Sequence, residues 1–126
     1  MIRVRLLLSG AAALLACSAA QAANGGDPAA GKRLFTQQCM LCHSTVAGEE
    51  GAAPSLFRVV GRKAASDSKF PAYSSALKGS GLTWTPAKLD TFLSGPSKLV
   101  PGTNMPITVP SPQDRRNIIA YLATVK

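Results

Sequence analysis

Aromatic side chains and cysteines are scarce in this sequence of 126 residues, which has four Phe, two Tyr, one Trp, three Cys and a single His. A single domain of this size is marginal when its stability depends on its own apolar core. So few cysteines also exclude a fold held together by several disulfides. Something else must therefore fill the centre, and a large flat apolar cofactor would do so.

Other patterns are missing as well. No segment alternates apolar and polar residues over a useful length, so strands are not expected, and no internal repeat is visible. Acidic residues are outnumbered, six against fourteen Lys and Arg, yet no run of five basic residues occurs. A basic protein tends to meet acidic partners or anionic membrane surfaces. The scattered charge argues against nucleic acid as a partner.

The first stretch has the order of a secretory signal peptide. Arg3 and Arg5 give it a positive start, residues 6–16 are almost wholly apolar, and Ala20-Gln21-Ala22 is a small-x-small cleavage site. The apolar run is shorter than the roughly 20 residues that a membrane-spanning helix needs. An uncleaved membrane anchor is therefore the weaker interpretation.

We expect residues 1–22 to be a signal peptide and residues 23–126 to be one exported domain. Export is a second argument against a nucleic-acid partner. An alternative start is a lipoprotein cleavage box, Leu14-Leu15-Ala16-Cys17, which would place a lipid on Cys17. Otherwise Cys17 is an apolar residue that is discarded with the signal.

Three helices are predicted from local start signals. A good N-cap residue is followed by proline at the first helical position at Asp27-Pro28, Thr85-Pro86 and Ser111-Pro112. We expect the first helix to run into Cys39, the second to stop at Gly95-Pro96 and the third to reach the C-terminus. A short fourth helix is expected over 74–78. Long loops, 44–72 and 95–110, complete an all-α fold and would be explained by wrapping around a cofactor.

The five residues Cys39-Met40-Leu41-Cys42-His43 form the attachment sequence for c-type haem. Positions i, i+3 and i+4 share one face of a helix, so both thiols can reach one porphyrin while His43 lies under the iron. A thioredoxin-like motif would need a βαβ setting, and a structural zinc site needs four ligands. A plain disulfide explains neither His43 nor the loops. Haem is therefore the preferred interpretation.

A sixth iron ligand can be sought by elimination. His43 is the only histidine, Met1 leaves with the signal peptide, and Met40 lies between the two cysteines. Met105 remains, in a loop stiffened by Pro101, Gly102 and Pro106. A lone loop methionine is more often a packing residue, so both roles stay open on these grounds. A thioether opposite histidine would favour reduced iron.

The chain from Gly31 to Leu122 resembles class I cytochrome c of the mitochondrial and α-proteobacterial type. Gly31, Phe35, Ile118 and Tyr121 match the family's crossing of the first and last helices. The resemblance implies the small class I cytochrome c fold, in which three main helices, a short one and long loops surround one covalent haem c.

The resemblance also implies roles for individual residues. The Pro54 carbonyl would accept the Nδ1 proton of His43, which orients the ring, and Met105 would be the distal ligand. Arg62, Tyr73 and Trp84 match groups that bind the haem propionates. The implied cofactor-binding set is Cys39, Cys42, His43, Pro54, Arg62, Tyr73, Trp84, Thr103 and Met105, with His43 and Met105 as the metal ligands.

The sequence departs from the family at several positions. Leu77 replaces a propionate-binding asparagine, Phe92 replaces a tyrosine near the methionine sulfur, and Ile107 replaces a phenylalanine at the haem edge, which predicts an altered polar network and potential. Mitochondrial members surround this edge with lysines. Of the corresponding positions here, only Lys98 is a lysine, and the others are Gln38, Ser97 and Asn104.

The leading functional hypothesis is a soluble, monomeric, periplasmic electron carrier that is not an enzyme. Its partners would be an oxidase, a cytochrome bc complex or a periplasmic dehydrogenase, with only transient membrane contact unless Cys17 is lipidated. One alternative is a dedicated cytochrome subunit of a periplasmic dehydrogenase. Another is a ligand-binding or peroxidase-like enzyme with an open iron, which requires that Met105 does not bind.

Overall fold

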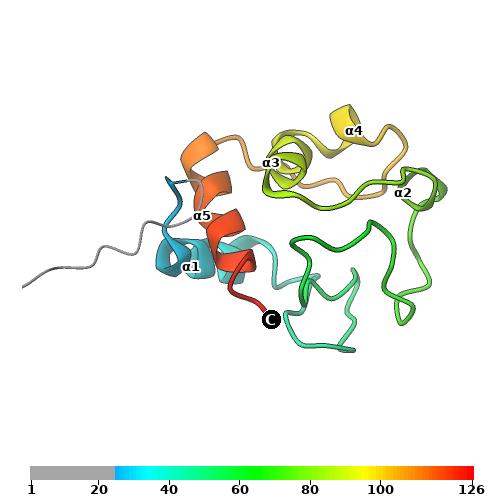
Figure 1. Cartoon of the computed structure of the whole chain (residues 1–126), viewed down its shortest axis with the longest axis horizontal. Helices are drawn as coiled ribbons and strands as arrows, with labels where there is room; N and C mark the ends of the chain where they lie inside the picture. Colours follow the sequence, from blue (N-terminus) through cyan, green and yellow to red (C-terminus); the bar gives the residue numbers. More distant parts are fainter. Residues whose placement is uncertain (1–24) are drawn as a thin grey trace, which may run out of the picture.

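The computed structural model describes residues 25–126. The expected signal peptide, its cleavage site and Cys17 lie outside the described residues. Five helices follow one another along the described chain (Figure 1): α1 Pro28–Gln38, α2 Ser75–Lys78, α3 Pro86–Ser94, α4 Pro96–Leu99 and α5 Pro112–Leu122. Within residues 25–126 the only β interaction is an isolated bridge between Lys63 and Thr83, so the all-α prediction is confirmed.

The helix starts are those that the N-cap residues predict. The Asp27 side chain accepts a hydrogen bond from the Ala29 amide, and the Thr85 and Ser111 side chains each accept one from the amide of the third residue of α3 and α5. Proline occupies the first turn of all three helices, where its missing N–H costs nothing. Ser74 caps the short α2 in the same way.

One helix was not predicted. Residues 95–110 were expected to form a loop, but α4 begins at Pro96, directly after α3 ends. Gly95 serves both helices, because its amide donates to the Phe92 carbonyl while its own carbonyl accepts from Lys98. The Gly-Pro pair that stops α3 therefore also supplies the proline that starts α4.

The first and last helices cross closely, as expected from the sequence. A Cβ on Gly31 would lie 1.9 Å from the Asn117 carbonyl oxygen, so only glycine allows this approach. The Phe35 and Tyr121 rings pack with centroids 5.4 Å apart, and Phe35 and Ile118 are each 1 % exposed. Figure 1 shows α5 lying across α1, beside the start of the long loops.

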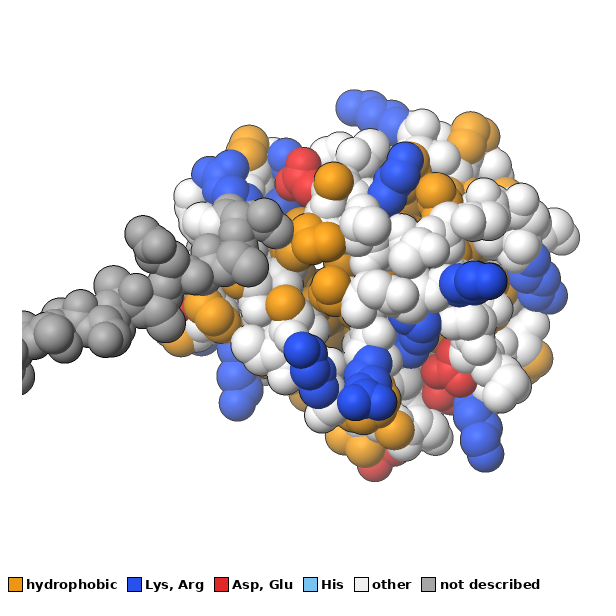
Figure 2. Space-filling model, in the orientation of Figure 1, with side chains coloured by type: hydrophobic (Ala, Val, Ile, Leu, Met, Phe, Trp, Pro, Cys, Tyr) orange, Lys and Arg blue, Asp and Glu red, His pale blue; other side chains and the backbone are white. Residues whose placement is uncertain are grey.

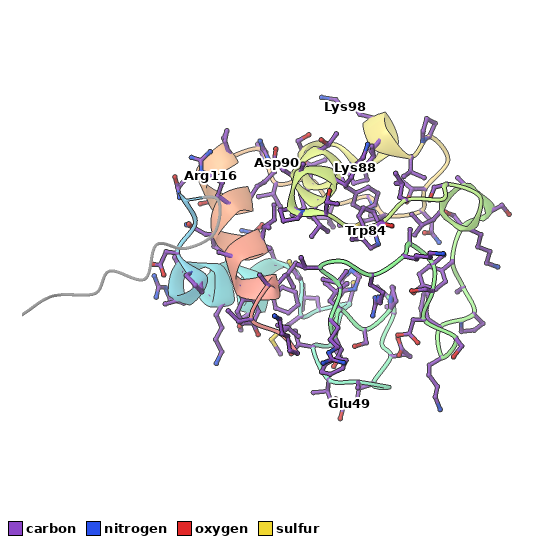
Figure 3. The ribbon with its side chains drawn as sticks, in the orientation of Figure 1. Glu49, Trp84, Lys88, Asp90, Lys98 and Arg116 are labelled. Carbon is purple, nitrogen blue, oxygen red and sulfur yellow. The ribbon has the colours of Figure 1, made fainter. Side chains whose placement is uncertain are left out.

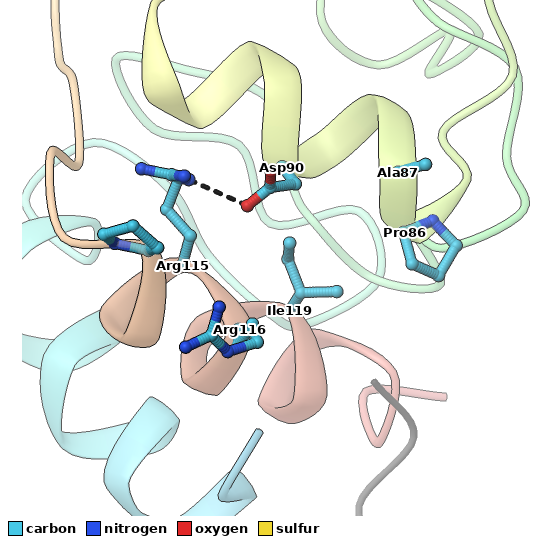
Figure 4. Close-up of a pocket in the computed structure, with 7 residues that line it drawn as sticks. Pro86, Ala87, Asp90, Arg115, Arg116 and Ile119 are labelled. Carbon is cyan, nitrogen blue, oxygen red and sulfur yellow. Dashed lines mark hydrogen bonds and ion pairs between the residues drawn. The ribbon is translucent and has the colours of Figure 1, made fainter. Parts of the chain in front are cut away.

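Helices α3 and α5 are joined by an ion pair between a nearly buried Arg115 and a partly exposed Asp90 (Figure 4). Arg115 Nε lies 2.8 Å from Asp90 Oδ1. The same guanidinium donates to the carbonyls of Val109 and Pro110, both at 2.9 Å. Arg115 therefore also holds the segment that connects the Met105 loop to α5.

The surface carries many basic side chains and few acidic ones. Figure 2 shows Lys and Arg side chains spread separately around one face, with apolar side chains between them. No helix of the described residues is long and apolar enough to cross a membrane.

Candidate functional site

A cavity of about 1370 Å³, including the solvent space at its mouth, lies between the loops and the helices. Figure 1 shows segment 44–72 on one side and α3 with the segment after α4 on the other. Much of the lining is apolar, with Phe35, Phe92 and Ile118 among its residues. All nine residues of the expected cofactor-binding set line this cavity: Cys39, Cys42, His43, Pro54, Arg62, Tyr73, Trp84, Thr103 and Met105.

The two cysteines lie just beyond α1 and not within it. Cys39 is the C-cap residue, and its amide donates to the Phe35 carbonyl at 2.8 Å. A further turn follows, in which the His43 amide donates to the Cys39 carbonyl at 2.9 Å. This bond has helical spacing, so it retains the shared face that the motif requires although the helix has ended. Neither cysteine forms a disulfide, so both are available for attachment of a cofactor. Before attachment, burial, followed by the nearby Cys42, raises the pKa of the Cys39 thiol to about 11.

His43 is oriented by a single strong hydrogen bond. Its Nδ1 lies 2.7 Å from the Pro54 carbonyl oxygen. A carbonyl can only accept, so Nδ1 carries the proton and Nε2 is left with the free lone pair that a metal needs. Burial lowers the pKa of His43, the bond to Pro54 opposes this, and the charge of Arg62 adds to the lowering. The ring is thus held in the neutral form that coordinates iron.

Arg62 has two visible partners and one unused donor. Its Nη1 and Nη2 donate to the carbonyls of Phe57 and Ser55, each at 2.8 Å. Its Nε is buried and has no hydrogen-bond partner among the described residues. A buried donor without a partner is costly, so a carboxylate in the cavity would complete this group. The family resemblance implied a propionate partner for Arg62, but not that Arg62 also holds the loop through the carbonyls of Ser55 and Phe57.

The two aromatic residues of the expected propionate site differ in exposure. Trp84 is buried and its ring packs edge-on against Phe92, with centroids 4.9 Å apart. Figure 3 shows Trp84 on the side of α3 that faces the long loops. Tyr73 is half-buried and packs against Phe70. Burial raises the pKa of Tyr73, so its hydroxyl stays protonated and can donate to an anion.

Met105 lies on a loop shaped by turns. The Thr103 amide donates to the Val100 carbonyl at 3.0 Å, and Gly102 takes a φ of 90° that favours glycine. The Thr103 hydroxyl accepts from the Met105 amide at 3.4 Å. Met105 itself is half-buried and packs against the core. This loop therefore presents the thioether toward the cavity, whereas Met40 is 56 % exposed and lies outside it.

Sequence reasoning passed over two residues beside this site. Glu50 Oε2 accepts from the Ser55 amide at 2.7 Å, and the Ser55 hydroxyl donates to the Val46 carbonyl at 2.7 Å. Ser55 is 1 % exposed. The only signal for Ser55 in the sequence was its position directly after Pro54. Glu50 gave no signal, because an acidic residue in a Gly-rich loop normally lies on the solvated surface.

The donors present fit a haem and not a simple ion. No group of three or more His, Cys, Asp or Glu side chains in residues 25–126 could hold a metal ion, which excludes a zinc-type cluster there. Two cysteines outside any disulfide, an imidazole with its Nε2 available, a thioether and an unpaired guanidinium N–H instead surround one apolar cavity. This is the donor set of a covalently attached porphyrin with buried carboxylates.

A model of the cytochrome c family matches residues 28–126. The chain belongs to the cytochrome c family. It is 48% identical over 101 residues to cytochrome c of Tetrahymena pyriformis, covering 79% of this chain and 90% of that one. It is 42% identical over 123 residues to cytochrome c2 of Rhodomicrobium vannielii, covering 96% and 94%. Among solved structures, cytochrome cH from Methylobacterium extorquens superposes with a TM-score of 0.73 at 44% identity, covering 79% of this chain and 99% of that chain.

Membership confirms the class I fold and the cofactor. The cytochrome carries one haem c, attached covalently through Cys39 and Cys42, and it functions as a small electron carrier. The haem supplies reversible one-electron chemistry at iron, while the protein supplies position, a dry shell and electrostatics.

Proposed function

We propose that this cytochrome is a soluble, monomeric periplasmic carrier, not an enzyme, whose iron is held in both redox states by His43 and Met105. The supporting observation is that one cavity is lined by the oriented imidazole of His43 and by the thioether of Met105. If His43 and Met105 both hold the iron, no position at the metal is left for a substrate. The haem would then supply one-electron transfer, with no bond formed to a substrate.

The residues of the chain have distinct roles in this proposal. Pro54 holds the His43 ring, so the ligand does not reorient when the charge changes. The loop around Thr103 holds Met105, whose soft sulfur favours the reduced state. Arg62 and Tyr73 donate to the propionates, whose charge could not otherwise be buried. Phe35, Phe92 and the other apolar lining residues exclude water.

Export is the second part of the proposal. We expect residues 1–22 to be removed as a signal peptide, which takes Cys17 with them. The order of charge, apolar run and small residues supports this. Mass spectrometry of the purified protein tests it, because a chain beginning at Ala23 with one haem is expected. A lipid-modified chain beginning at Cys17 would contradict it.

Replacement of Met105 tests the axial ligand. We expect Met105→Ala to lower the midpoint potential, change the ferric optical spectrum and allow the ferrous protein to bind carbon monoxide at neutral pH. The wild-type protein should not bind carbon monoxide readily, because both axial positions are filled. Met40→Ala is the matched control, since Met40 is exposed and outside the cavity. An unchanged spectrum and potential in Met105→Ala would show that Met105 is not the ligand.

A dedicated subunit of a periplasmic dehydrogenase is a second candidate function. Three positions where mitochondrial relatives carry lysine hold exposed neutral residues here, namely Gln38, Ser97 and Asn104. Large apolar side chains are exposed as well, with Leu41 at 84 %. A fixed apolar interface suits a permanent partner better than a transient one. Copurification of a stable dehydrogenase complex from the periplasm would favour this candidate.

A further inference from the structure

The peptide group between Pro54 and Ser55 is hydrogen-bonded at both ends. Its carbonyl oxygen accepts from His43 Nδ1 at 2.7 Å. Its N–H, which belongs to Ser55, donates to Glu50 Oε2, also at 2.7 Å. The carbonyl and the N–H of one peptide are conjugated and lie in one plane. A carboxylate and the proximal imidazole are therefore connected through a single polarisable group.

This connection is shielded from water. Ser55 is 1 % exposed. The second carboxylate oxygen of Glu50, Oε1, is also buried and has no hydrogen-bond partner among the described residues. Arg62 Nη2 holds the next carbonyl, that of Ser55, at 2.8 Å. Hydrogen bonds in a low-dielectric interior are stronger, those to a charged acceptor stronger still, and bonds in a chain polarise one another.

We infer that Glu50 is a positioning residue for His43, acting through the Pro54–Ser55 peptide. The carboxylate draws the Ser55 N–H toward itself, which shifts electron density onto the Pro54 oxygen and strengthens its bond to His43 Nδ1. The imidazole then becomes a stronger electron donor to iron. The inference rests on the proposed role of His43 as an axial ligand. A stronger donor stabilises Fe(III), so Glu50 lowers the midpoint potential and opposes the effect of Met105.

A negative charge near the haem would also lower the potential simply through space, so the two effects need separating. The neighbouring Glu49 carries the same charge but is exposed, and its carboxylate accepts only a long 3.5 Å bond from Ser44 Oγ. Figure 3 shows Glu49 projecting from the outer edge of the molecule. Glu49→Gln therefore removes one charge from the same loop without touching the Pro54–Ser55 peptide.

Two substitutions at Glu50 separate charge from contact. Glu50→Gln keeps an acceptor for the Ser55 N–H but removes the charge. Glu50→Asp keeps the charge but is one methylene shorter, which draws the carboxylate away from that N–H. A field effect predicts a large change in midpoint potential in Glu50→Gln, a small one in Glu50→Asp, and an unmoved His43 Nδ1 resonance in both. Action through the peptide predicts that the potential and the Nδ1 resonance change in both variants.

The experiment uses the haem-loaded protein as it is secreted. It has two readouts, the midpoint potential and the NMR resonance of the His43 Nδ1 proton in the diamagnetic ferrous state. We expect Glu50→Gln to raise the equilibrium constant for reduction by about threefold to tenfold over Glu49→Gln, or about 30 to 60 mV, since 59 mV is tenfold for one electron. Glu50→Asp should raise it in the same direction. The Nδ1 proton should move upfield in both, as its hydrogen bond weakens, and stay in place in Glu49→Gln.

Equal potentials in Glu50→Gln and Glu49→Gln, or an Nδ1 resonance that does not move, would overturn the inference. An unchanged potential in Glu50→Asp would do the same, and this variant decides the question if Glu50→Gln does not accumulate. Failure of the proposed function looks different. In that case the wild-type ferrous spectrum itself would lack the ring-current-shifted signals of an iron-bound His43.

Discussion

Arg115 shows how one buried charge is accommodated. Its side chain is 11 % exposed, and its donors are directed at Asp90 and at the carbonyls of Val109 and Pro110. Burying a guanidinium is tolerated only when its N–H groups are satisfied. Figure 4 shows it reaching from α5 to α3, while its neighbour Arg116 lies apart from Asp90.

Truncation of Arg115 should therefore be costly. We expect Arg115→Ala to lower the free energy of unfolding by about 2 to 4 kcal/mol, because two carbonyls and Asp90 lose their partner and a buried side chain leaves a space. Arg116→Ala is the control and should change the free energy of unfolding by less than about 0.5 kcal/mol, since the Arg116 side chain pairs with Gln113 at the surface. Guanidinium titration of both ferric proteins measures the difference. Equal decreases in the free energy of unfolding would show that the buried contacts of Arg115 add no stability beyond that of a surface arginine.

Local sequence signals set the starts of α1, α3 and α5 and the end of α3 at Gly95-Pro96, whereas tertiary packing sets the end of α1. Proline after a capping residue placed the starts of α1, α3 and α5 correctly, because both signals act within one turn. The end of α1 at Gln38 has no such local signal. The chain turns there so that Cys39 and His43 can face the cavity. Helix α4 was not predicted, because its start signal at Pro96 is part of the Gly95-Pro96 pair that was interpreted only as the end of α3.

The close crossing of α1 and α5 can be tested by a substitution at Gly31. We expect Gly31→Ala to destabilise the protein by about 1 to 3 kcal/mol or to displace α5, because the new methyl group would lie 1.9 Å from the Asn117 carbonyl oxygen. Gly79→Ala is the matched control, since its Cβ would meet Ser75 at an ordinary 3.4 Å. Thermal unfolding of the two variants checks this. A Gly31→Ala protein as stable as Gly79→Ala would mean that the helices can separate freely.

The whole molecule is organised around a space that the chain does not fill. Apolar side chains that form the core on one side, such as Phe35, Trp84 and Phe92, also line the cavity. An unfilled apolar cavity costs roughly 24 cal/mol per Å³. The part of this cavity that compares with measured cavity volumes is about 240 Å³. Left empty, it would cost roughly 6 kcal/mol, which lies within the whole stability of a typical domain, about 5 to 15 kcal/mol.

Removal of the cofactor should therefore unfold the protein. We expect residues 23–126, produced in the cytoplasm without haem attachment, to lose most of the far-UV helical signal and the dispersion of its amide NMR spectrum. The haem-loaded protein in the same buffer is the reference. A cofactor-free chain with native helix content would show that the polypeptide core suffices by itself.

How far the sequence could predict the site differs from residue to residue. Cys39, Cys42 and His43 form a contiguous motif, so their joint chemistry is visible without any structure. For Met105 the sequence alone left two roles open, iron ligand and packing residue. Only the family resemblance favoured the role of ligand. Arg62, Tyr73 and Trp84 came from the resemblance alone, because nothing local distinguishes them from ordinary surface or core residues.

The sequence by itself determined the haem attachment site, the helix starts and the excess of basic over acidic residues, since each of these is a property of neighbouring residues. Only the tertiary structure decided what surrounds His43. Pro54 is eleven positions away, and its carbonyl, the Ser55 amide and the Glu50 carboxylate meet because the loop folds back on the motif. Backbone groups carry no mark in a sequence, so a contact made through one peptide becomes visible only when the chain is folded.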